Sequence, residues 1–246
     1  MAINSGIFFR HQVTPYVILF IERDGSTYLT SLLMSHPDIN AVYERFAVLK
    51  QKGTGAQEQL EWADKFFTPP LVGRKAVVGF KTKLVDVLDL EGFSQLLIRK
   101  KVRILQMHRR NRVKAVVSRI NARRLYEASG KWNLYKESDR MPPMTIDLEE
   151  FDRFLKEREQ ADQDLEDFAA RLGLPRLRLV YEDLLKDRDA VMESVFTFLH
   201  VKSKPVQAST LKHTKDNLRE AILNYDLLRT RYIGTLYEEM FDEVLV

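Results

Sequence analysis

The fold is decided by the stretch from Tyr16 to Leu33, which reads Tyr16-Val-Ile-Leu-Phe-Ile, then Glu22-Arg-Asp-Gly-Ser-Thr, then Tyr28-Leu-Thr-Ser-Leu-Leu. Its first part is a short β-branched and aromatic run, which is typical of a strand buried on both faces. From Tyr28 onward the apolar residues recur at helical spacing, and Pro37 disfavours helix beyond about Ser35. The stretch therefore predicts a strand, a tight turn and a helix in direct succession.

The turn between them carries a cation, a glycine and two hydroxyls, at Arg23, Gly25, Ser26 and Thr27. The first N–H groups of a helix have no partner within the helix, and its dipole favours a negative charge there. Gly25 allows the backbone to approach a ligand closely, and the hydroxyls can donate hydrogen bonds. We interpret the turn as a phosphate-binding loop.

The chain has 246 residues, of which 45% are hydrophobic and 30% are charged, so it can bury one large core. It contains no cysteine, which excludes disulfides, thiolate metal sites and a cysteine nucleophile. No apolar run approaches the roughly 20 residues that a membrane span needs, and the N-terminus lacks a secretory pattern. We expect one domain over residues 1–246 and a cytoplasmic location.

The net charge of +4 is unevenly distributed. Between Glu91 and Glu127 there is no acidic residue, but there are eleven cations: Arg99, Lys100, Lys101, Arg103, Arg109, Arg110, Arg112, Lys114, Arg119, Arg123 and Arg124. Such a segment indicates an anionic partner.

Further strands and helices alternate along the chain. Strands are predicted at 76–80, 102–107 and 177–180, and helices around 62–67 and at 93–98, 113–125, 147–172, 190–199, 216–223 and 227–236, with 50–58 as loop or frayed helix. This order predicts an α/β fold with a P-loop-like central parallel sheet, flanked by helices on both faces. Ligands of such sheets bind beyond the carboxyl ends of the strands, where the 23–27 loop, Lys81 and Arg110 would lie.

Residues 129–145 interrupt the pattern with Gly130, Pro142 and Pro143. The segment nevertheless carries large apolar side chains, namely Trp132, Tyr135, Met141 and Met144. We interpret it as a lid or a wall of the pocket for the second substrate.

Five segments resemble, in order, the sulfotransferases that use 3′-phosphoadenosine 5′-phosphosulfate (PAPS), especially their bacterial and cyanobacterial branch. They are Arg23-Asp-Gly-Ser-Thr, Phe80-Lys-Thr-Lys, Arg110-Asn-Arg-Val-Lys-Ala-Val-Val-Ser118, Val180-Tyr-Glu-Asp-Leu and Leu211-Lys-His-Thr with Ile222-Leu-Asn-Tyr-Asp after it. One such match is weak evidence, but five in family order cover nearly the whole chain.

The resemblance implies PAPS as the donor, adenosine 3′,5′-bisphosphate as the product and no metal. It implies that the 5′-phosphosulfate is bound by the loop, the 3′-phosphate by Arg110 and Ser118, and the adenine near Tyr181. The nucleotide-binding residues would be Arg23, Asp24, Gly25, Ser26, Thr27, Tyr28, Arg110, Ser118, Tyr181, Lys212, His213 and Thr214. The catalytic residues would be Glu44, Lys81 and Arg23.

Two positions depart from the family pattern. Asp24 stands where the family usually has serine, and its carboxylate competes with a phosphate for the helix dipole, so we expect it to point off the loop. Lys83 stands where animal cytosolic members have a catalytic histidine. An ammonium with a pKa of about 10.4 is a poor base at neutral pH, so Glu44 is the predicted general base.

Other functions remain open at this stage. A P-loop small-molecule kinase would need a Gly-x-x-x-x-Gly-Lys motif, which is missing. A family member that binds nucleotide without catalysis is compatible with Asp24. A nucleic-acid-binding protein could use residues 99–124, but this function leaves the loop without a role. The predicted partner is a small-molecule or carrier-bound hydroxyl acceptor; the oligomeric state is not predicted.

Overall fold

The computed structural model describes residues 13–68, 75–132, 134, 136–208 and 216–245. Its strands are β1 Thr14–Leu19, β2 Ile39–Val42, β3 Val77–Thr82, β4 Arg103–His108 and β5 Arg176–Val180. The α-helices are α1 Ser26–Ser35, α2 Arg45–Gln51, α3 Ala56–Phe67, α4 Leu90–Lys100, α5 Arg112–Ser129, α6 Leu148–Arg171, α7 Tyr181–Lys186, α8 Arg188–Leu199, α9 Tyr225–Thr230 and α10 Glu238–Asp242. Short 3₁₀ turns span Leu84–Asp86, Glu137–Asp139 and Leu218–Glu220.

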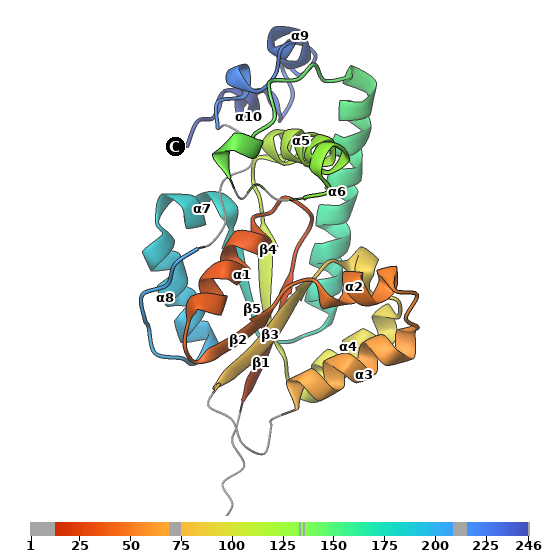
Figure 1. Cartoon of the computed structure of the whole chain (residues 1–246), viewed down its shortest axis with the longest axis vertical. Helices are drawn as coiled ribbons and strands as arrows, with labels where there is room; N and C mark the ends of the chain where they lie inside the picture. Colours follow the sequence, from red (N-terminus) through yellow and green to blue (C-terminus); the bar gives the residue numbers. More distant parts are fainter. Residues whose placement is uncertain (1–12, 69–74, 133, 135, 209–215, 246) are drawn as a thin grey trace, which may run out of the picture.

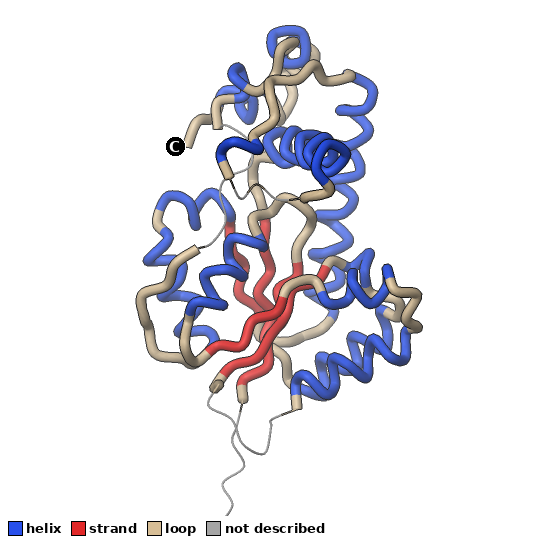
Figure 2. The backbone as a smooth tube through the Cα atoms, in the orientation of Figure 1, coloured by secondary structure: helices blue, strands red, loops and turns tan. Residues whose placement is uncertain are grey.

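The five strands form one sheet in the order β2-β3-β1-β4-β5, and every neighbouring pair is parallel. The predicted parallel α/β fold is confirmed. Figures 1 and 2 show helices on both faces of the sheet, with α5, α9 and α10 beyond one end of the strands. The loops after β1 and β4 lie at that end, so these helices cover the edge where ligands of parallel sheets bind.

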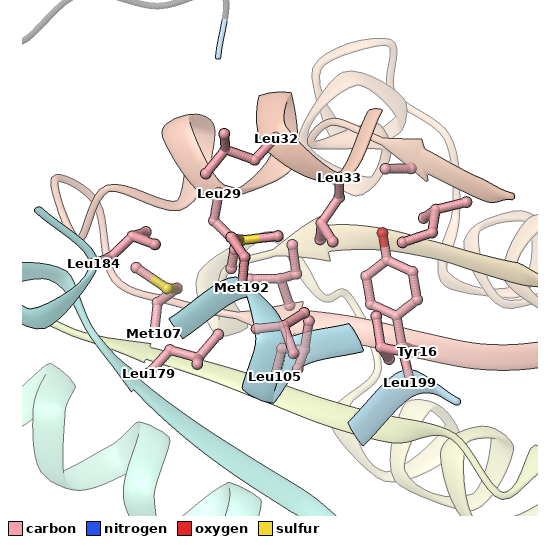
Figure 3. Close-up of a cluster of buried hydrophobic side chains, with 14 of the residues drawn as sticks. Tyr16, Leu29, Leu32, Leu33, Leu105, Met107, Leu179, Leu184, Met192 and Leu199 are labelled. Atoms are coloured by element: carbon pink, nitrogen blue, oxygen red, sulfur yellow. The ribbon is translucent and has the colours of Figure 1, made fainter. Parts of the chain in front are cut away.

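The central strand β1 is buried on both faces, as its sequence predicts. Tyr16, Ile18 and Phe20 point into one core with α1, α7 and α8, while Val17, Leu19 and Ile21 point into the other. Figure 3 shows the first core, in which Leu29, Leu32 and Leu33 of α1 and Met192 and Leu199 of α8 pack together on one face of the sheet. This packing fixes where α1 begins, and so where the phosphate-binding turn lies.

The opposite face is covered by α2, α3, α4 and the C-terminal half of α6. Seven aromatic residues gather there: Phe46, Trp62, Phe66, Phe67, Phe80, Phe93 and Phe168. Phe80 lies on β3 directly before Lys81, so this core holds the strand end from which Lys81 projects.

A third core joins α5, the N-terminal half of α6, α9 and α10. The segment before α6 also bonds to the C-terminal region: Met144 N–H donates to Ala221 O at 3.0 Å, and Leu223 N–H donates to Met144 O at 2.8 Å. Asn224 adds a reciprocal pair of hydrogen bonds with the backbone of Ile146. The end of the 129–145 segment and the C-terminal region are therefore joined by main-chain pairing.

Some predicted boundaries are wrong. The first strand lies two residues earlier than predicted, and the edge strand β2 was not predicted. Residues 50 and 51 end α2, and 56–58 begin α3, so only the turn between them matches the predicted loop. In the C-terminal region a 3₁₀ turn and the short α9 stand where longer helices were predicted. The helix predicted at 147–172 is confirmed as α6, and Asp147 caps it by accepting from Glu150 N–H at 2.8 Å.

Candidate active site

The 23–27 loop connects β1 to α1 through two residues in the left-handed region. Arg23 has φ of 71° and Gly25 has φ of 81°. Gly25 precedes the first turn of α1 and has no side chain to cap it. The N–H groups of this turn are therefore available to an anion, as the sequence predicts for a phosphate loop.

Asp24 points away from that anion position. Its side chain is fully buried, accepts a hydrogen bond from Ile21 N–H at 3.0 Å, and forms an ion pair with Arg158 of α6. The orientation expected from the sequence is the one observed. Burial raises the pKa of Asp24 to about 6, although Arg158 acts in the opposite direction.

Arg23 and Ser118 lie together although they are far apart in the sequence. Arg23 Nε donates to Ser118 Oγ at 2.9 Å, and Arg23 Nη1 lies 3.4 Å from Trp132 O. Within the described part of the chain, no carboxylate lies within 4.0 Å of this half-buried guanidinium. Burial, and then the nearby Arg109, lower the pKa of Arg23 to about 10, so it remains a cation at neutral pH.

Lys81 joins the end of β3 to the phosphate loop. Its ammonium donates to Thr27 Oγ1 at 2.7 Å and to Ser26 Oγ at 3.3 Å, and it forms an ion pair with Glu44 Oε1 at 2.9 Å. Burial lowers the pKa of Lys81, and Glu44 opposes that change. The three predicted sites at the loop, Lys81 and Glu44 therefore form one cluster.

Glu44 is the accessible acid of this cluster. Its side chain is 32% exposed, while that of Lys81 is 2% exposed, and its second oxygen lies 3.7 Å from Lys83 Nζ. Burial alone would raise the pKa of Glu44, but Lys81 and Lys83 outweigh it and hold that pKa below its ordinary value. Glu44 is therefore an ionised carboxylate at neutral pH, and part of its side chain is accessible to solvent.

Tyr181 packs against the loop from the end of β5. A Cβ atom added at Gly25 would lie 2.2 Å from the Tyr181 ring, so only glycine fits there. The guanidinium of Arg109 lies 4.8 Å from the centre of the same ring, and Arg109 Nη1 donates to Arg23 O at 3.1 Å. Tyr28, on the first turn of α1, is half-buried against the core with α8.

Arg110 does not contact the loop with its side chain. Its guanidinium is 57% exposed and pairs with Asp183 at 2.8 Å. The backbone N–H groups of Arg110 and Asn111 donate to the buried Glu182 carboxylate at 3.0 and 3.1 Å. The sequence analysis expects Arg110 and Ser118 at the 3′-phosphate. In the structure Ser118 contacts Arg23, whereas the Arg110 side chain is exposed and pairs with Asp183.

Some predicted residues lie outside the described part of the chain. These are Lys212, His213 and Thr214 of the predicted nucleotide cover, and Tyr135 of the predicted acceptor wall. Of the other wall residues, Trp132 is exposed and stacks on Tyr126 with ring centres 4.2 Å apart, while Met144 is buried.

Two site residues were missed by the sequence analysis, Arg109 and Arg158. Arg109 was not predicted as a site residue because the segment that resembles the family begins at Arg110. Arg158 lies in a helix rich in charged residues, but it follows Phe154 and Leu155 by four and three positions, which places it on their buried face. That spacing was the available signal.

Other parts of the chain neutralise much of the basic 99–124 stretch. Ion pairs join Arg99 to Asp64, Arg110 to Asp183, Arg112 to Asp162, Lys114 to Asp216, Arg119 to Glu157 and Arg123 to Glu150. A surface for nucleic acid needs cations free to meet phosphates, so this pairing disfavours the nucleic-acid alternative. Among the described residues there is no cluster of three or more potential metal ligands, and no helix is long and apolar enough to span a bilayer.

The chain is 26% identical to nodulation protein H of Rhizobium tropici over 243 residues, which cover 93% of each chain. The comparison with protein-family models finds no match.

Three solved structures also resemble this chain. The sulfotransferase from Alicyclobacillus acidocaldarius is 16% identical, with a TM-score of 0.49, over 93% of this chain and 95% of that one. The sulfotransferase domain from the curacin biosynthetic pathway is 12% identical, with a TM-score of 0.42, over 79% and 76% of the two chains. A mouse sulfotransferase in complex with PAP is 12% identical, with a TM-score of 0.43, over 78% and 61%. All three of these solved structures are described as sulfotransferases.

Proposed function

We propose that this chain is a PAPS-dependent sulfotransferase that transfers a sulfuryl group to a hydroxyl of a small-molecule or carrier-bound acceptor. The observation that carries the proposal is the meeting of Arg23 with Ser118, and of Lys81 with Thr27 and Glu44, around one uncapped helix N-terminus. This arrangement brings cations, hydroxyls and one accessible carboxylate to the ligand edge of the sheet.

The residues fit a nucleotide with phosphate at both ends. Arg23 is a half-buried cation that, within the described residues, hydrogen-bonds only to a hydroxyl and a carbonyl oxygen. A guanidinium in such surroundings favours an anion, because its burial is otherwise not compensated by charge. The first-turn N–H groups of α1 would hold the 5′-phosphosulfate, and Ser118 would donate to the 3′-phosphate.

When bound, PAPS supplies the sulfuryl group and the bisphosphate leaving group. Glu44 accepts the proton of the acceptor hydroxyl, a role that suits an ionised and partly exposed carboxylate. Arg23 and Lys81 stabilise the negative charge that develops on the 5′-phosphate side. Positioned positive charges stabilise the transition state of phosphoryl transfer in the same way.

Calorimetric titration with adenosine 3′,5′-bisphosphate, followed by a screen of hydroxyl acceptors with sulfate-labelled PAPS, tests this function. We expect saturable binding without added magnesium and labelled product with at least one acceptor class. A strict magnesium requirement together with phosphate transfer from ATP would instead support the kinase alternative.

A further inference from the structure

The phosphate loop adopts a conformation that its own sequence does not favour. Arg23 is a non-glycine residue with φ of 71°, and the next residue but one, Gly25, has φ of 81°. A left-handed conformation is unfavourable for a non-glycine residue, so surrounding contacts must hold Arg23 in place. Arg109 and Ser118 contact Arg23 directly, and a further set of contacts holds Asp24, the residue between Arg23 and Gly25.

Asp24 is anchored from behind the loop. One carboxylate oxygen accepts from Ile21 N–H at 3.0 Å, and the other pairs with Arg158 Nη2. The Asp24 side chain is 0% exposed and that of Arg158 is 4% exposed. Arg158 Nη1 also donates to Glu22 O at 3.3 Å, so one guanidinium binds the loop at two points.

Arg158 is itself fixed within a longer network. Its Nε donates to Asp162 Oδ1 at 3.1 Å, one turn further along α6. Asp162 Oδ2 accepts from Arg112 Nε at 2.8 Å, and Arg112 begins α5, the helix that carries Ser118. Figure 1 shows α6 running past both α5 and the end of the sheet, as this network requires. The loop and the helix bearing Ser118 are thus held to the same rigid element.

We propose that the Asp24–Arg158 pair positions the phosphate loop, an inference that rests on the proposed function for its effect on nucleotide binding. By fixing Asp24, Arg158 keeps Arg23 in the left-handed conformation that aims its guanidinium at Ser118. It also neutralises a carboxylate that would otherwise repel a bound phosphate. Arg158 is a positioning residue, because within the described contacts it reaches the loop and not the ligand side.

The test compares Arg158→Met, Arg158→Lys, Asp24→Asn and the double variant D24N/R158M with the unmodified chain. Two quantities are measured: the dissociation constant of adenosine 3′,5′-bisphosphate, and amide hydrogen exchange of peptides covering residues 21–29 in the ligand-free protein. Glu166→Gln is the matched control, since Glu166 lies about two turns further along α6 and pairs with Arg176.

We expect R158M to weaken bisphosphate binding about 10- to 100-fold and to increase exchange over residues 21–29, since small misplacements of binding groups have effects of that size. R158K should be intermediate, because one ammonium cannot reproduce two guanidinium contacts. The double variant should bind more tightly than R158M, because it removes the unpaired buried charge that R158M leaves. E166Q should match the unmodified chain in both measurements.

Unchanged binding and unchanged exchange in R158M and D24N would overturn the positioning role. If R158M does not fold, D24N and the double variant carry the same comparison. If the unmodified chain does not bind the bisphosphate, the proposed function fails. Faster exchange over residues 21–29 in R158M would then still support the loop anchor, and unchanged exchange would remove it as well.

Discussion

The ammonium of Lys81 lies 2.9 Å from Glu44 Oε1. The same ammonium donates to Thr27 on the phosphate loop, so the proposed base and the proposed phosphate site share one cation. A ligand phosphate that draws Lys81 toward the loop would weaken its pairing with Glu44 and raise the basicity of that carboxylate. Under the proposed function, nucleotide binding and proton acceptance would be coupled through the buried side chain of Lys81.

Glu44→Gln should reduce turnover by about two to four orders of magnitude, the usual contribution of a general base, while leaving the bisphosphate dissociation constant nearly unchanged. The acidic limb of kcat/KM, which reports the ligand-free protein, should lie below the ordinary range of glutamate, because Lys81 and Lys83 lower the pKa of Glu44 despite its burial. Steady-state rates and calorimetry on both proteins check this. Equal loss of turnover and affinity would make Glu44 structural.

Arg110→Ala and Ser118→Ala should each weaken adenosine 3′,5′-bisphosphate more than adenosine 5′-phosphate, because both are assigned to the 3′-phosphate. We expect S118A to disturb the position of Arg23 more than R110A does, because S118A removes the hydroxyl to which Arg23 Nε donates at 2.9 Å. Titration of both ligands into both variants measures the difference. Losses of the same size for the two nucleotides would withdraw the 3′-phosphate assignment.

Gly25→Ala should destabilise the fold and the loop together. The new methyl group would lie 2.2 Å from the Tyr181 ring at a backbone φ of 81°, and we expect about 2–4 kcal/mol of lost stability from overpacking and strain. Gly130→Ala is the matched control, because Gly130 has φ of 68° and nothing within 4 Å of an added Cβ. It should lose only about 1 kcal/mol. Urea unfolding of both variants checks the comparison, and equal losses would contradict the contact with Tyr181.

Asp24→Asn should change how stability depends on pH. Burial raises the pKa of Asp24 to about 6, against about 4 when unfolded, so the folded chain binds more protons at this residue between those values. Relative to D24N, the unmodified chain should therefore lose about 2 kcal/mol of unfolding free energy as the pH rises from 4 to 6, and change little above pH 7. Urea unfolding across this range measures the difference. If the unmodified chain instead gained stability relative to D24N as the pH rises, the effect of Arg158 on the pKa of Asp24 would outweigh that of burial.

The sequence predicted the parts of the molecule that obey local rules. The strand at Tyr16, the start of the helix at Asp147 and the placement of Lys81 at the end of a buried strand follow from periodicity and turn chemistry. The edge strand β2 was missed because Ile39–Val42 is only four residues long and follows Pro37. Four residues give too little periodicity to distinguish a strand from a loop.

The site was only partly predictable for a different reason. Arg109 faces inward and its neighbour Arg110 does not. This choice depends on where β4 ends and on the carboxylate of Glu182, which lies in α7 directly after β5. The pairing of Asp24 with Arg158 spans 134 residues of sequence. Local patterns describe neighbours along the chain, so a contact of that range becomes visible only when the helix α6 is placed against the sheet.

The backbone bonds between Met144 and residues 221–223 have a consequence for how this protein could acquire new acceptors. We expect replacement of the predicted acceptor wall by itself to break this pairing, because Met144 forms a β-bridge with Ile222. A graft from a relative should fold only when residues 129–146 and 216–245 are transplanted together. Substrate range in this molecule would then diversify by exchange of two coupled modules, and not by drift within a single loop.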